Sequence, residues 1–78
     1  MSGIGNVIGG GTRSEAEYDA SNNLIFWGTS AAGSLTSAAV WRIVKFTYDA
    51  SNNLLTAKWA DKARFTQVWD DRGSLSYT

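Results

Sequence analysis

Short apolar runs flank two polar turns in this chain, and the same seven residues form both turns. The heptapeptide Tyr-Asp-Ala-Ser-Asn-Asn-Leu stands at residues 18–24 and again at residues 48–54. Asn and Asp tolerate a positive φ and hydrogen-bond to their own backbone, so this heptapeptide is typical of a turn. The pattern predicts two related β-hairpins, with strands near residues 15–19 and 24–28 and near residues 40–49 and 54–60.

The run from Val40 to Tyr48 has the strongest β character, because it is rich in β-branched and aromatic residues. Its apolar side chains point to both faces, with Trp41 and Ile43 on one face and, on the other, Val40, Val44, Phe46 and Tyr48. A strand that is apolar on both faces is expected to be covered on both. Two arrangements fit this pattern: a sandwich-like core, or a core on one side and a partner on the other. The return strand places Leu55, Ala57 and Trp59 on one face, opposite Thr56 and Lys58.

The two ends of the chain are less regular. Residues 1–14 hold five glycines and little periodicity, which predicts an extended N-terminal arm before a single small β domain at residues 15–78. The isolated apolar residues of this arm, Ile4, Val7 and Ile8, join no periodic stripe, so we expect them to bind pockets on a neighbouring subunit. A frayed terminus is the alternative. Near the other end, Thr66 is a candidate N-cap for a short helical turn that Gly73 ends, before a last strand at residues 74–77.

Composition favours a partner-dependent domain. The chain has 78 residues with no cysteine and no histidine, which excludes disulfides and thiolate or imidazole zinc sites. So short a chain builds only a marginal core, and small folds without such cross-links often gain stability by oligomerising. Four tryptophans are a large aromatic load for this core. We expect at least two of Trp41, Trp59 and Trp69 to be largely buried once subunit contacts are included, and Trp41 and Trp69 are candidate partner-binding residues.

Charge and motifs exclude several functions. Seven basic and seven acidic residues give no net charge and no basic footprint for nucleic acid, and no apolar run is long enough for a membrane span. The N-terminus lacks the features of a signal peptide, so synthesis in the cytoplasm is expected. Asp19, Ser21 and Asn23 have the spacing of a calcium loop but lack its glycine and glutamate, so neither metal nor cofactor is expected. Asp70 and Asp71 are expected at a surface turn. Without histidine no serine is activated, so we expect no enzyme.

The second half of the chain carries a family resemblance. The segments Trp41-Arg42-Ile43, Tyr48-Asp49, Trp59-Ala60-Asp61, Phe65, Val68-Trp69-Asp70-Asp71-Arg72 and Ser74-Leu75-Ser76-Tyr77 follow one another in order. This order resembles a group of short proteins, and some fibre-protein segments, encoded among the virion genes of tailed bacteriophages. Many of them read W-R-I-x-K-x-x-Y-D, then W-A-D-G, then F-D-N-V-W-D-D-R-A-S-L-S-Y. The resemblance covers roughly half of the chain. It departs at Lys62, where glycine is usual, at Thr66-Gln67, where Asp-Asn is usual, and at Gly73, where alanine is usual.

The resemblance implies a setting in the virion more than a mechanism. We therefore expect a non-enzymatic structural protein of a tailed-phage virion: a head decoration or cement protein, a neck component, or a fibre or fibre-adaptor subunit. Its partners would be other virion proteins and copies of itself in a symmetric homo-oligomer, with no nucleic acid or membrane involved. The alternative is a carbohydrate-binding module that recognises a host surface glycan through exposed tryptophans. The two classes differ in whether the tryptophans are buried or present coplanar exposed rings.

Overall fold

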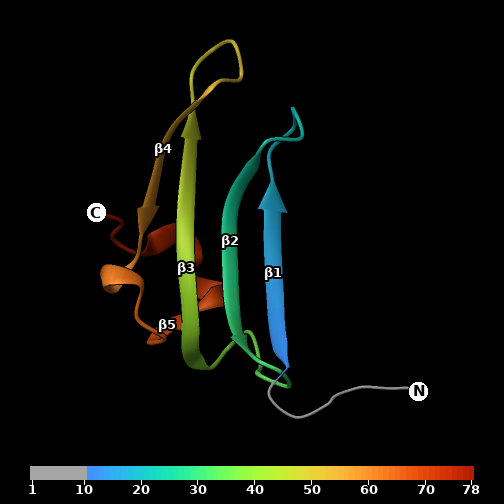
Figure 1. Ribbon diagram of the computed structural model, residues 1–78, viewed down its shortest axis with the longest axis vertical. Helices are drawn as coiled ribbons and strands as arrows, with labels where there is room; N and C mark the ends of the chain where they lie inside the picture. The colour runs from blue at the N-terminus through green and yellow to red at the C-terminus, as the bar shows by residue number, and fades with distance from the viewer. Residues whose placement is uncertain (1–10) are drawn as a thin grey trace, which may run out of the picture.

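The computed structural model describes residues 11–78, which form a small antiparallel β-sheet with a short C-terminal layer on one side. The sheet is a meander in the order β1-β2-β3-β4. A fifth, two-residue strand pairs with the start of β3 through Ala39 and Val68. The strands are β1 (Thr12–Tyr18), β2 (Leu24–Ala31), β3 (Ala39–Tyr48), β4 (Leu54–Trp59) and β5 (Gln67–Val68). Figure 1 shows the four long strands side by side, with both hairpin turns at the same end of the sheet. The all-β fold expected from the sequence is confirmed.

Both copies of the repeated heptapeptide are hairpin turns, as predicted. In the first, the carboxylate Oδ1 of Asp19 accepts hydrogen bonds from the backbone N–H groups of Ser21 (2.8 Å) and Asn23 (2.9 Å). The second turn has the same two hydrogen bonds, which Asp49 accepts from Ser51 and Asn53. The asparagine before the last turn residue, Asn22 in the first turn and Asn52 in the second, has a φ of 63° or 65° respectively. The backbone N–H of Asn23 is the main cause that lowers the pKa of Asp19. Because these bonds are local, the heptapeptide dictates its own conformation wherever it stands.

Strand β1 begins earlier than the sequence indicated. It starts at Thr12 and pairs with β2 from Thr12 opposite Ala31 to Tyr18 opposite Leu24. Residues 12–14, which were assigned to the N-terminal arm, therefore belong to the sheet. These three residues are all polar and lack the alternating apolar residues that mark a strand. Only their pairing with β2 shows that they belong to a strand. Ile4, Val7 and Ile8 lie outside the described residues.

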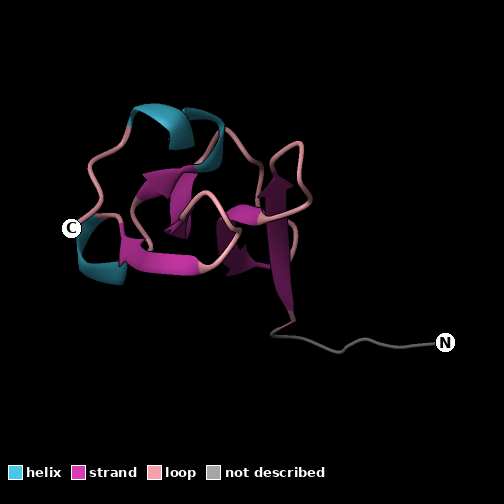
Figure 2. Cartoon of the chain, turned by 90° about the horizontal axis from the view of Figure 1, so that it is seen from above, coloured by secondary structure: helices cyan, strands magenta, loops and turns pink. Residues whose placement is uncertain are grey.

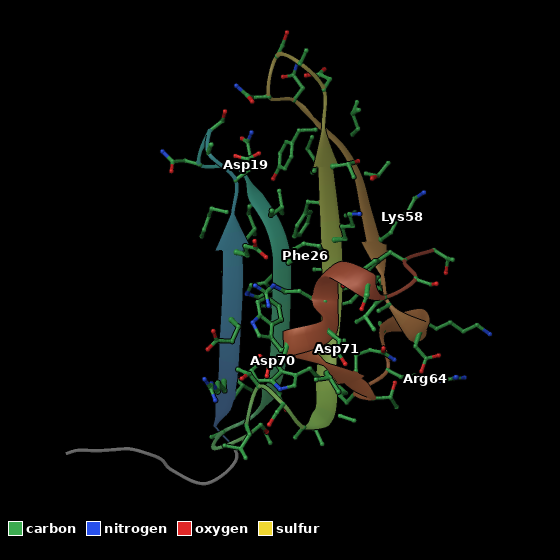
Figure 3. The ribbon with its side chains drawn as sticks, turned by 180° about the vertical axis from the view of Figure 1, so that it is seen from behind. Asp19, Phe26, Lys58, Arg64, Asp70 and Asp71 are labelled. Atoms are coloured by element: carbon green, nitrogen blue, oxygen red, sulfur yellow. The ribbon has the colours of Figure 1, made fainter. Side chains whose placement is uncertain are left out.

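The chain after β4 covers one face of the sheet. It forms two 3-10 turns, η1 (Asp61–Ala63) and η2 (Trp69–Ser74). Figure 3 shows η2 lying across this face, and Figure 2 shows one helical turn beyond the strands on that side, while Figure 1 shows η1 beside the end of β4. The core lies between the layers, where Trp41 is 0% exposed and Trp69 is 5% exposed, with Ile43 beside them. The ring centroids of Trp41 and Trp69 are 6.0 Å apart. A Cβ added to Gly28 would stand 2.8 Å from the Trp69 ring, so only glycine allows this close approach.

The C-terminal segment differs from its prediction in three details. Thr66 caps no helix; its hydroxyl donates instead to the Asp61 carboxylate at 2.7 Å. Gly73 lies inside η2 rather than after it. The expected strand at residues 74–77 is reduced to a single bridge between Ala60 and Tyr77. These residues carry no strong local turn signal, so packing of Trp69 and Tyr77 against the sheet decides their path.

The turn after β4 contains three consecutive residues in the left-handed region: Asp61, Lys62 and Ala63, with φ values of 47°, 56° and 65°. Left-handed backbone costs a residue with a Cβ roughly 1–2 kcal/mol. Glycine adopts this region without that cost, so the backbone conformation at Lys62 is one that favours glycine. The lysine here keeps the conformation at an energetic cost.

Replacing Lys62 with glycine should therefore stabilise the fold. We expect a gain of roughly 0.5–1 kcal/mol, because the relieved backbone strain exceeds the entropy that glycine adds to the unfolded chain. The free energy of unfolding in a denaturant titration measures it. The matched control is Lys58→Gly in β4, which should lose roughly 0.5–1 kcal/mol. A Lys62→Gly protein no more stable than the original would show that the turn is not strained.

Candidate functional site

The two faces of the sheet differ in charge. We call the face under η2 the back face and the opposite one the front face. Strand register places nearly all charged strand residues on the back face: Arg13, Glu15, Glu17, Lys45 and Lys58. Arg42 is the one charged strand residue on the front face among the described residues. In most antiparallel sheets the solvated face is polar and the covered face apolar. Here the face without its own covering layer is the more apolar one.

The front face is built around one cross-strand row. Ala16 pairs with Trp27, Trp27 with Val44, and Val44 with Trp59, so the row crosses all four long strands. The alternation of side chains along each strand adds Ile25, Phe46, Leu55 and Ala57 to the same face. No element of residues 11–78 lies over it, and Figure 1 shows this side of the strands uncovered. Leu55 is 61% exposed, while Val44 is shielded to 3% by its neighbours. A continuous apolar sheet face of this kind marks an interaction site.

Arg42 lies on the front face near the start of β3, between two aromatic rings. Its guanidinium carbon stands 4.8 Å from the Trp59 ring centroid and 5.2 Å from that of Phe65. Such stacking holds a guanidinium in place through the negative ring faces. Arg42 forms no ion pair with a described residue, and its Nε atom is buried without a hydrogen-bond partner. A held, unpaired guanidinium is suited to bind a carboxylate or another planar anion.

A groove of about 690 Å³ opens beside Arg42. Its walls combine apolar side chains with hydroxyl groups from β1, β2 and the following loop, namely Val40, Phe65, Thr12, Thr29, Ser30 and Ser34. Ser30 and Ser34 are already committed, because their hydroxyls donate to the Val40 carbonyl at 2.8 Å and to the Ala31 carbonyl at 2.7 Å. The groove thus offers one cation, hydroxyl groups and apolar walls on the surface that the fold leaves open.

The C-terminal motif has a structural role on the back face. Arg72 donates from Nε to the Glu17 carboxylate at 2.7 Å, and its guanidinium stacks on Trp69 at 4.7 Å. The Tyr77 hydroxyl donates to the Arg72 carbonyl at 2.8 Å, and partial burial raises the pKa of Tyr77 to about 12. Leu75 packs against the core. The W-D-D-R-x-S-L-x-Y ending therefore fastens the covering layer to the sheet.

The structure corrects two of the five predicted partner-binding residues. Trp41 and Trp69 are buried within one chain, and the Trp41 Nε1 donates to the Leu35 carbonyl at 2.9 Å, so neither ring is available to a partner. At least two of the three tryptophans are buried, as expected, but against the chain itself. No prediction from the sequence named Trp27, Arg42 or Phe65 as a binding residue. The apolar positions that alternate with Trp41 and Ile43 along β3 were the available signal.

The described residues form no candidate metal centre. They contain no cluster of three or more residues able to hold a metal ion. Asp70 and Asp71 are exposed on η2, without a side-chain hydrogen bond to another described residue. In the two calcium-like loops, the aspartate Oδ1 atoms are already occupied by backbone N–H groups of the turn. Across residues 11–78, no helix has the length and apolar character needed to cross a membrane.

Comparisons with models of protein families, with curated proteins and with solved structures find no match to this chain.

Proposed function

We propose that this chain is a non-enzymatic structural protein of a tailed-phage virion, and that its front face is the surface it uses to join other subunits. The observation that carries this proposal is the apolar front face, from Trp27 to Trp59, which the chain's own C-terminal layer leaves uncovered. Burial of such a face provides the main free energy of protein association. The motif resemblance supplies the virion setting.

A glycan-binding role is less well supported by the arrangement of the tryptophans. Sugar platforms need exposed rings, whereas Trp41 and Trp69 lie in the core and Trp27 and Trp59 are half-buried. One side of the Trp59 ring is also taken by Arg42. A flat apolar face with a single arginine suits a protein surface better than a row of sugar hydroxyls.

Residues 1–10 precede the groove-lining Gly11 and lie outside the described residues. The hypothesis that this segment binds a neighbouring subunit through Ile4, Val7 and Ile8 stays a prediction. Deleting this N-terminal segment should leave the domain folded and weaken its incorporation into virus particles.

The proposed function is tested by finding the protein in particles. In purified virions of the phage whose genome encodes this chain, quantitative mass spectrometry should detect it at a fixed copy number that is a multiple of a particle symmetry. Such a fixed ratio is expected because symmetric assembly sets the number of copies. The protein could instead be absent from particles while the purified chain binds host glycans specifically. That pair of results would contradict the structural role and support the carbohydrate-binding alternative.

A further inference from the structure

We propose that copies of this chain join head to tail, with the front groove at Arg42 of one copy receiving the Asp70 and Asp71 carboxylates of the next. The inference rests on the proposed function, and it names the partner and the charge pair at the same front face. It follows from which charged side chains form ion pairs within a single chain and which do not.

Two acidic side chains of the described residues have no charge partner among those residues. Of the chain's seven acidic residues, Glu15, Glu17 and Asp61 form ion pairs with arginines. Asp19 and Asp49 accept the backbone N–H groups of the hairpin turns. Asp70 and Asp71 remain, exposed and without an ion pair to a described residue. Figure 3 shows both on η2, on the back of the molecule.

Arg42 is the complementary group on the opposite side. It is the lone front-face charge among the described strand residues. It is also the one described arginine that forms no ion pair with a described carboxylate. Its stacking between Trp59 and Phe65 holds the guanidinium in place, so less side-chain entropy is lost when an anion binds. A carboxylate entering the groove that Arg42 lines would form charge-assisted hydrogen bonds with its guanidinium group.

Apolar residues flank both partners of this charge pair. On the back, the backbone N–H of Asp70 donates to the Thr36 carbonyl at 3.1 Å, which places the neighbouring Leu35, 67% exposed, beside the acidic pair. On the front, Val40 and Phe65 are exposed walls of the groove. Contact between Leu35 and these walls would exclude water around the ions. Shielded ion pairs are stronger than exposed ones, and an apolar rim protects them from solvent.

Charge also decides between head-to-tail and front-to-front packing. Two front faces packed together would bring two Arg42 side chains into one interface that contains no front-face carboxylate from the described strands. Buried cations without a counter-charge are costly. A head-to-tail contact pairs unlike charges instead. Because this contact is heterologous, each copy keeps one free front and one free back, and copies add into a ring or a helical array.

Mixing two disabled variants gives the sharpest test. Arg42→Glu disables the front, and Asp70→Lys with Asp71→Lys disables the back. Each full-length variant alone should sediment as a monomer, with self-association roughly tenfold weaker or more than that of the unmodified chain. Their mixture should associate again into alternating arrays, because the intact front of one variant meets the intact back of the other and the two reversed surfaces also carry opposite charges. A chain carrying all three reversals should regain self-association, because its charge pair is restored with opposite sign.

Circular dichroism of each variant controls for folding. If Arg42→Glu unfolds, Arg42→Gln replaces it and should show the same loss. Unmodified protein that remains monomeric at every concentration would overturn the head-to-tail inference, as would a mixture that stays monomeric. Those results would leave the proposed function standing, because that is tested by the protein's presence in particles.

Discussion

Replacing Trp41 with alanine should unfold the chain. The Trp41 ring is completely buried between the sheet and η2, contacts Trp69, and donates a hydrogen bond to the Leu35 carbonyl. Removing a buried tryptophan costs about 3–5 kcal/mol. At roughly 0.05–0.15 kcal/mol per residue, a domain of this size has about 4–12 kcal/mol of total stability. We expect the variant to lose its cooperative thermal transition or to melt far below the original protein.

The matched control is Trp59→Ala. Trp59 lies at the edge of the front face and is half-buried, so its loss removes contacts to Arg42 but no core packing. The Trp59 variant should remain folded with a smaller loss of stability, measured by the same thermal melt. If Trp41→Ala melts like the original protein while Trp59→Ala unfolds, the core has been placed on the wrong face of the sheet.

The hairpins were predictable because their determinants are local. Asp19 and Asp49 each hold their turn with residues at most four positions away, and Asn22 and Asn52 accept the positive φ that the turn requires. The strand boundaries followed from these turns, except at the start of β1 at Thr12 and at the end of β2, which reaches Ala31 rather than residue 28. At Thr12 the pairing partner, Ala31, lies across the hairpin and carries no signal in the residues around Thr12.

The candidate site was only partly predictable. Alternation along β3 showed that both faces are apolar and left open whether a partner covers one of them. It could not show which face the chain covers itself, because that depends on Trp69 and Tyr77, which reach β2 and β3 from far along the sequence. Trp41 was consequently assigned to a partner surface, while Trp27 and Arg42, on the opposite face, were passed over. The pairing of Arg72 with Glu17 is likewise a long-range contact that no local pattern reveals.

The central claim is that the front face binds other subunits, and a pair of variants on β4 tests it. Leu55→Glu with Ala57→Glu places two charges on the front face at exposed positions, so the isolated domain should stay folded. The control, Lys58→Glu, changes charge on the back face of the same strand. Losing the burial of one leucine costs an interface about 2 kcal/mol, or roughly 30-fold in affinity, before the cost of burying charge is added.

The decisive measurement is the copy number of each variant in particles assembled without the original protein. We expect the Leu55→Glu/Ala57→Glu protein to be nearly absent from particles and the Lys58→Glu protein to be present at the normal copy number. Folded Leu55→Glu/Ala57→Glu protein incorporated at full copy number would contradict the claim that the front face joins the subunits.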